Sequence, residues 1–165
     1  MNIGRIATHL LMTPRRIRRA FPRVTLSAIE HAIQVSQSAH VGQIRFAVEG
    51  ALHGAALYQG QSPRERAIAV FSQLRMWDTE HRNGVLIYLL LADCAVEIVA
   101  DRGAHTKVGS QEWENICRRM QAAFKEGRYE AGVVDGIQEL TRHLTKHFPA
   151  YGHEQRQLPD APALL

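Results

Sequence analysis

The stretch Asn83-Gly84-Val85-Leu86-Ile87-Tyr88-Leu89-Leu90-Leu91 decides the fold of this chain. Asn-Gly marks a turn, and the apolar run after it has the length of a strand that is buried on both faces. Residues 92–94 predict a tight turn, and residues 95–100 predict a second strand that returns beside the first as a hairpin. A sheet that is buried on both faces needs a layer of helices on each side, so the stretch indicates an α/β protein.

The segments around this hairpin predict one further strand and four helices. Residues 43–49 alternate between apolar and polar side chains, which is typical of a strand. Helical spacing predicts a helix over 25–39 capped by Thr25, a helix that opens at Ser62-Pro63, a helix capped by Ser110, and a helix over 129–147. Residues 50–60 and 101–103 are expected to be a loop and a polar turn. The order predicts a three-layer α/β/α sandwich with a small central mixed sheet.

The charge is unevenly distributed over a chain whose length of 165 residues suits one domain. Residues 1–23 carry six arginines and no acidic residue, so the net charge of +4 comes from a basic N-terminal arm. A domain over 24–149 and a polar C-terminal tail over 150–165 follow it. The arm has three open interpretations: a docked segment with a solvated arginine face, attachment to an anionic membrane surface, or contact with a partner's acidic face. Nucleic acid is disfavoured, because the rest of the chain has no basic stripe.

Other features of the composition point to the cytoplasm. No apolar stretch is long enough to span a membrane, and the start of the chain lacks the apolar region of a secretory signal. Cys94 and Cys117 form no disulfide framework and are expected to be small core residues. We therefore expect a cytoplasmic protein, and the basic arm favours a peripheral position at the inner membrane.

The predicted topology sorts the polar residues to two ends of the sheet. If strands 43–49 and 85–91 are parallel, Glu49 and Asp93 follow their carboxyl ends, while Asp101 returns to the opposite end beside Asn83 and Thr79. Asp101 at the end of a strand can ligate Ca²⁺ or Mg²⁺, with further oxygens from Asp78, Thr79 and Asn83.

Arg102 can hold a phosphate group through its planar fork. The alternative is that Asp101-Arg102-Gly103 and Asn83-Gly84 are only turns. Glu49 and Asp93 are a weaker candidate for a shared metal. His143 and His147 lie four apart on a helix, where a solvated helix end is the favoured interpretation.

An ordered set of short segments then suggests a family. The segment Thr79-Glu80-His81-Arg82-Asn83-Gly84-Val85-Leu86-Ile87-Tyr88 resembles the signature of the TPM domain family. Similar segments occur in the same order, and together they cover roughly residues 25–160. They are Gln43-Ile44-Arg45 with Glu49, Phe71–Met76, Asp101-Arg102-Gly103, Trp113, Phe124–Tyr129 with Gly132, Phe148-Pro149 and Leu158-Pro159-Asp160.

The resemblance is greatest to a short bacterial branch without a signal peptide or a membrane span. It implies an α/β/α sandwich, with weak acid phosphatase activity in some members, divalent-cation binding in others, and repair or assembly of membrane complexes in still others. The chain departs from the pattern at Gln43, where glutamate is usual, and at Asp101, near positions that are often glycine in the secreted branch.

Three functions remain open at this stage. The first is a binding or accessory module with weak divalent-cation binding, which acts on a protein partner at the cytoplasmic membrane surface. The second is a weak metal-assisted acid phosphatase, in which Asp101 and Arg102 hold the metal and the phosphate. The third is a structural interaction domain without a site. A nucleotide-dependent enzyme is disfavoured, since the chain has none of the glycine-rich phosphate-binding motifs.

Overall fold

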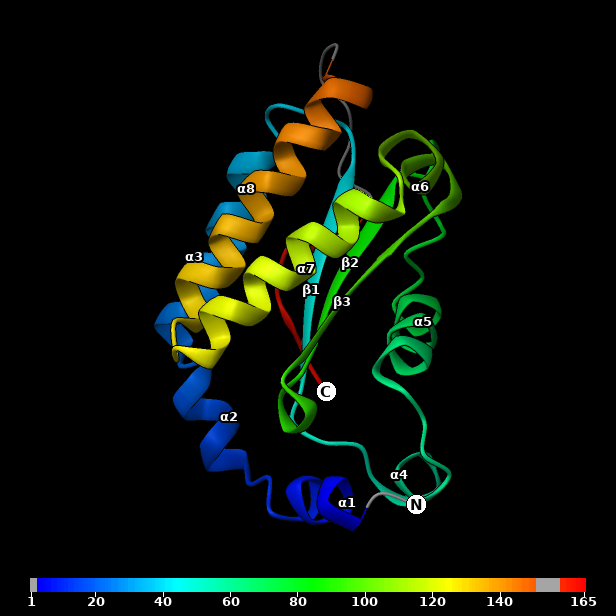
Figure 1. Cartoon of the computed structure of the whole chain (residues 1–165). Coiled ribbons are helices and arrows are strands. Elements are labelled where there is room, and N and C mark those ends of the chain that lie inside the picture. The colour runs from blue at the N-terminus through cyan, green and yellow to red at the C-terminus, as the bar shows by residue number, and fades with distance from the viewer. Residues whose placement is uncertain (1–2, 151–157) are drawn as a thin grey trace.

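A four-stranded sheet lies between two layers of helices in the computed structural model, which describes residues 3–150 and 158–165 (Figure 1). The strand order is β3-β2-β1-β4, with β1 at Gln43–Glu49, β2 at Gly84–Leu90, β3 at Ala95–Ala100 and β4 at Ala163–Leu164. β1 pairs in parallel with β2 and with β4, whereas β2 and β3 are antiparallel. The expected three-layer sandwich with a mixed sheet is confirmed.

The two central strands are parallel because a helical crossover joins them. It contains α4 (Gly54–Tyr58) and α5 (Pro63–Gln73). The predicted helix start at Ser62-Pro63 is confirmed, and a capping box between Ser62 and Glu65 caps it. The short 3-10 helix η1 (Leu91–Asp93) connects β2 to β3. Every residue of β2 is buried, as its uninterrupted apolar sequence predicts.

One face of the sheet packs against α3 (Arg23–Ser36), α7 (Ser110–Lys125) and α8 (Tyr129–His147). Their apolar stripes meet the side chains of alternate residues in β1, β2 and β3, such as Phe46, Ile87 and Ile98. The opposite face packs mainly against α5 and its neighbours, where Ala67, Val70 and Phe71 cover Tyr88 and other strand residues. Burial of both apolar faces is the main force that holds the layers together.

The start of α3 differs from the prediction. The helix begins at Arg23 and its N-cap residue is Pro22, while Thr25 is buried and its hydroxyl donates to Glu130 Oε2 at 2.7 Å. Thr25 therefore joins α3 to α8 instead of capping α3. Threonine serves both purposes, and only the packing of the two helices decides between them.

Two further segments predicted as irregular contain helices. The loop over 50–60 includes α4, and the polar turn at 101–103 opens α6 (Arg102–Val108), with Asp101 as its N-cap residue. Ser110 makes no side-chain cap for α7, whose N-cap residue is Gly109. Both unpredicted helices are short, so apolar periodicity gives little signal of them.

The described part of the C-terminal tail contains the strand β4. The Leu165 N–H donates to the Val48 carbonyl at 3.0 Å, and the Gln37 amide donates to Asp160 Oδ1 at 2.6 Å. The edge of β1 is thereby covered, which satisfies backbone groups that would otherwise be unpaired. The sequence analysis predicts no strand in this tail, because two residues are too few to show strand periodicity.

The N-terminal arm forms two helices, α1 (Ile3–Leu10) and α2 (Pro14–Ala20), which lie at the end of the sheet where η1 is found (Figure 1). Phe21, directly after α2, is buried against the rings of Phe46 and Tyr129. Across the described ranges, the helices lack the combination of length and apolar character that is needed to cross a bilayer.

Candidate functional site

Buried polar side chains gather at both ends of the central strands. At the amino ends of β1 and β2 these are His40, Gln43, Thr79 and Asn83, and near the carboxyl ends they are His9 and Glu49. A buried polar group is costly unless it has a hydrogen bond. The partners of these groups therefore show whether each end is a structural joint or a place where a ligand can bind.

The first end is held together by Asn83. Its backbone N–H donates to the Thr79 hydroxyl at 3.1 Å, and its side-chain amide donates to the Val41 carbonyl at 3.0 Å. Asn83 thus fixes the turn before β2 against the segment before β1. The Thr79 hydroxyl and the side-chain NH₂ group of Asn83 are thus engaged in this joint.

Asp101 lies at the same end, as the topology predicted. Its backbone N–H donates to the Gly84 carbonyl at 2.8 Å, and its Oδ1 accepts from the Arg102 N–H at 2.6 Å. Its Oδ2 is buried and has no hydrogen-bond partner within the described part of the chain. The carboxylate therefore caps α6 with one oxygen and leaves the other unengaged.

The start of α6 packs closely on the turn before β2. A Cβ on Gly103 would lie 2.6 Å from the Arg82 carbonyl oxygen and 2.8 Å from that of His81, and the Ala104 N–H bonds to the Arg82 carbonyl. The fold thus brings Thr79, Asn83 and Asp101 to one end. Asp78 and Arg102 are exposed. Within residues 3–150 and 158–165, no group of three or more His, Cys, Asp or Glu side chains is arranged to hold a metal ion.

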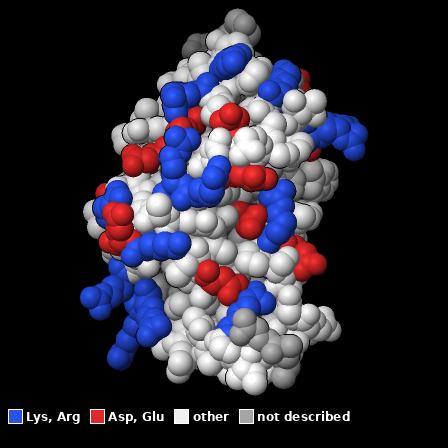
Figure 2. Space-filling view, viewed as in Figure 1, with Lys and Arg blue, Asp and Glu red and all other residues white. Residues whose placement is uncertain are grey.

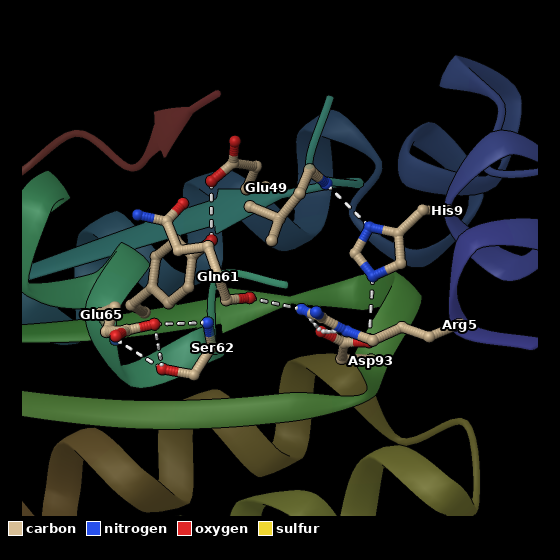
Figure 3. A network of polar contacts seen from close by, with 9 residues as sticks. Arg5, His9, Glu49, Gln61, Ser62, Glu65 and Asp93 are labelled. Atoms are coloured by element: carbon tan, nitrogen blue, oxygen red, sulfur yellow. Dashed lines mark hydrogen bonds and ion pairs between the residues drawn. The ribbon is translucent and has the colours of Figure 1, made fainter. Parts of the chain in front are cut away.

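The second end contains a network that the sequence did not predict, centred on Asp93 (Figure 3). Arg5 donates to both carboxylate oxygens of Asp93, with its Nη2 2.8 Å from Oδ2, and also to the Gln61 carbonyl. His9 Nε2 lies 2.9 Å from Asp93 Oδ1, while His9 Nδ1 accepts from the Leu52 N–H at 2.9 Å. Because Nδ1 accepts this hydrogen bond, the ring hydrogen is on Nε2, which donates a hydrogen bond to Asp93.

This network fastens α1 to the domain. Burial alone raises the pKa of Asp93, but the hydrogen bonds from Arg5 and His9 outweigh it, and the net effect lowers the pKa. The only sequence feature that indicates this network is the spacing of Arg5 and His9, which are four residues apart and so lie on one face of a helix. It pointed to no partner, because Asp93 lies in a distant segment.

Glu49 is held by a second network near the same end. Arg66 donates from Nε to Oε2 at 2.8 Å and from Nη2 to Oε1 at 3.0 Å, and the buried Tyr88 hydroxyl donates to Oε2 at 2.6 Å. Burial, together with the bond to Glu49, raises the pKa of Tyr88 well above its usual value. Glu49 and Asp93 are therefore each neutralised by an arginine, and this arrangement disfavours the metal shared between them that the sequence suggested.

The remaining residues that the sequence analysis singled out are a pair of histidines on α8 and the two cysteines. His143 lies 3.7 Å from Glu112 Oε2, and His147 is at the last turn of α8, where its pKa is lowered by desolvation and by neighbouring positive charges. Burial raises the pKa of the Cys117 thiol to about 12, so this thiol is unreactive. Cys94, in contrast, is exposed with φ of 49°, and the expectation that it lies in the core is wrong.

The most distinctive exposed feature is the helix α2. Its four arginines, Arg15, Arg16, Arg18 and Arg19, are exposed, and the structure shows no hydrogen-bond or ion-pair partner for them among the residues it describes. Figure 2 shows basic side chains projecting where α2 lies. Ile3, Leu10 and Leu11 are 75%, 64% and 66% exposed on the adjoining α1 segment. Exposed apolar side chains on and just after α1 are therefore followed along the chain by exposed cationic side chains on α2.

The geometry defines a class of protein. It is an α/β/α sandwich domain in which hydrogen bonds and ion pairs hold the polar side chains at both ends of the sheet, and a basic helical segment lies at one of these ends. The chain belongs to the TPM domain family, whose model matches residues 19–143. No match to a curated protein was found.

Two solved structures are similar to the chain. The BA42 protein of the psychrophilic bacterium Bizionia argentinensis is 30% identical, with a TM-score of 0.73 over 85% of this chain and 92% of that protein. The N-terminal domain of a protein from P. gingivalis is 16% identical, with a TM-score of 0.63 over 79% of this chain and 82% of that domain. The second likeness concerns the fold alone.

Proposed function

We propose that this TPM domain protein is a peripheral accessory module that docks on an anionic membrane at its cytoplasmic face and there serves a membrane-associated protein partner. The observation that carries the proposal is the set of exposed side chains on the N-terminal segment that contains α1 and α2. It combines four arginines without intramolecular partners in the described structure with the exposed side chains of Ile3, Leu10 and Leu11.

The physical basis is additive attraction between this region and acidic lipids. Each arginine near an anionic surface contributes roughly 1 kcal/mol, and exposed leucine and isoleucine side chains add burial in the lipid interface. The arm is docked by the Asp93 network, so the helices are already in place when the surface is met. Less conformational entropy is then lost on binding than if the arm folded there.

Vesicle cosedimentation tests the proposal. We expect binding to vesicles that contain phosphatidylglycerol, weak binding to pure phosphatidylcholine, and a loss of binding as salt concentration rises. The double variant Arg15→Gln/Arg18→Gln removes roughly 2 kcal/mol of attraction and should weaken binding about thirtyfold. The matched control Arg118→Gln/Lys146→Gln removes two exposed charges from α7 and α8 and should bind like the original chain. Equal effects of the two variants would contradict docking through α2.

Cation binding at Asp101 is a second candidate, favoured by the buried and unengaged Asp101 Oδ2. In this proposal Ca²⁺ or Mg²⁺ takes that oxygen, with hydroxyl, amide or water oxygens from the surroundings of Thr79 and Asn83 completing the shell. In the same proposal the exposed Arg102 attracts a phosphate ester to this end. A metal at Asp101 together with a phosphate ester at Arg102 would then give a weak phosphatase activity.

A metal titration followed by two-dimensional NMR tests this candidate. Saturable shifts of amides around Thr79, Asn83 and Asp101 are expected, and Asp101→Asn should abolish them while the fold is kept, because asparagine is also a good helix cap. If the original chain hydrolyses a generic phosphate ester and Asp101→Asn does not, the phosphatase activity is supported as well. No saturable shift below about 10 mM would contradict the site.

A further inference from the structure

A groove lies between the N-terminal helices and the end of the domain that η1 and the connection from α7 to α8 form. Its volume is about 540 Å³, within the range of about 300–1,000 Å³ that is typical of small-molecule sites. Residues from α1, α2, η1 and the connection from α7 to α8 line it. They are Thr8, Met12, Arg16, Arg19, Ala20, Leu91, Ala92, Cys94, Gly127 and Tyr129.

Two cationic side chains border this groove. Arg16 and Arg19 are three apart on α2 and thus lie on the same face of the helix, and the structure gives neither a carboxylate partner within its described ranges. None of the described lining residues is acidic. Glu126, which precedes Gly127, is already paired with Arg128 at 2.6 Å. The charge of the described lining residues is therefore positive, and it favours an anion.

Apolar side chains form the rest of the wall. Leu91 and Ala92 are each 8% exposed, and Met12 packs partly against the core. The Tyr129 ring contacts Phe124 and Phe21 with ring centroids 5.3 and 5.5 Å apart, which holds it in place. A free inorganic anion would leave this apolar surface uncovered, whereas a ligand with both a phosphate and methylene groups would cover it.

We propose that the groove binds the phosphate-bearing headgroup of a single anionic lipid. Arg16 and Arg19 hold the phosphate, and guanidinium groups suit this purpose because they bind phosphate oxygens through paired hydrogen bonds. The Tyr129 hydroxyl is a further donor at the wall. The methylene groups next to the headgroup lie against Met12 and Leu91. This inference rests on the proposed membrane docking and names the lipid chemistry that α2 selects.

The test uses a soluble short-chain lipid, so that binding in the groove is measured without a membrane. Dihexanoyl phosphatidic acid is titrated below its micelle concentration into the labelled full chain, and amide shifts are followed by NMR. We expect saturable shifts at Leu91, Ala92, Gly127 and Tyr129. Dihexanoyl phosphatidylcholine and inorganic phosphate, titrated in parallel, should each bind at least about tenfold more weakly.

Two charge-matched variants separate the groove from general electrostatics. Arg16→Gln/Arg19→Gln should weaken binding of the short-chain lipid by about tenfold or more, whereas Arg15→Gln/Arg18→Gln removes the same charge from the same helix and should change it less than about twofold. All four side chains are exposed, so both variants are expected to fold. Equal weakening in the two variants would overturn the groove assignment, as would equal affinity for phosphatidylcholine or for inorganic phosphate.

Vesicle binding by the same proteins distinguishes failure of this inference from failure of the proposed function. Vesicle binding without saturable shifts in the groove would overturn the lipid site and leave surface docking in place. Saturable shifts without vesicle binding would support the lipid site and overturn membrane docking.

Discussion

Gly84 has no space for a side chain, because a Cβ at this position would lie 2.0 Å from the carbonyl oxygen of Met76. The Asn83-Gly84 pair predicts a turn, and a turn alone would tolerate many residues. The close approach of the Met76 backbone gives a stricter reason for the glycine. It also explains why the turn residues pack beneath the first residues of the central strand.

We therefore expect Gly84→Ala to be severely destabilising. The backbone of Met76 cannot move away without disturbing β2, so the free energy of unfolding should fall by on the order of 3 kcal/mol or more. Urea unfolding measures the change. Gly54→Ala serves as the comparison: its φ of +54° makes alanine strained there, but no atom lies within 4 Å of a Cβ at that position. An effect at Gly84 no larger than at Gly54 would contradict this reason.

Asp93 gives a pH dependence with a definite sign. Its pKa is lowered in the folded protein, because the bonds from Arg5 and His9 outweigh the effect of burial. The stabilisation from these bonds is therefore present above the ordinary aspartate pKa of about 3.9 and is lost as the pH falls through the lower folded value. Asp93→Asn should reduce the free energy of unfolding at pH 7 by on the order of 2 kcal/mol. Its stability should also fall less steeply than that of the original chain between neutral and acid pH.

His40 contributes a second pH dependence at a higher range. Burial lowers its pKa to about 4, with a weaker opposing contribution from the backbone of Gly42. The unfolded chain takes up a proton near pH 6.5 and the folded chain does not, so stability falls as the pH drops from about 6.5 to about 4. NMR of the imidazole ring should show His40 neutral at pH 5.5. A ring that titrates near pH 6.5 would contradict the prediction.

At the scale of elements, β4 completes the sheet although its sequence is only Ala163-Leu164. It covers the edge of β1, which otherwise presents unpaired backbone groups to solvent. We expect removal of residues 163–165 to speed amide hydrogen exchange along β1 between Ala47 and Glu49. The free energy of unfolding should fall by about 1 kcal/mol. Exchange in β3, on the opposite edge, is the internal control and should not change.

The whole molecule is expected to unfold as one unit that includes the basic arm. Phe21 is 3% exposed in the core, and Arg5 and His9 bind Asp93, so the arm shares contacts with both the core and the end of the sheet. Trp77 and Trp113 lie outside the arm, and their fluorescence reports on the domain. NMR signals of α1 and α2 should disappear at the same urea concentration as the tryptophan transition. An earlier loss of the arm signals would show that the arm is independent.

The sequence by itself determined the layered fold and most of the strands and long helices. These elements depend on local periodicity and on helix caps, which a few neighbouring residues reveal. Examples are the apolar run of β2, the alternation in β1, and the Ser62-Pro63 start of α5. The sequence also placed Asp101, Asn83 and Thr79 at one end, since that follows from the order of the strands.

Only the tertiary structure decided what each polar residue does. Asp93 with Arg5, Glu49 with Arg66, and Asn83 with Val41 are pairs separated by 88, 17 and 42 positions, and no local pattern connects them. The same reason applies to the groove, which is lined by Arg16 and Tyr129 although they are 113 positions apart in the sequence. Long-range packing chooses among partners that are chemically equivalent in the sequence, and it leaves the α2 arginines exposed.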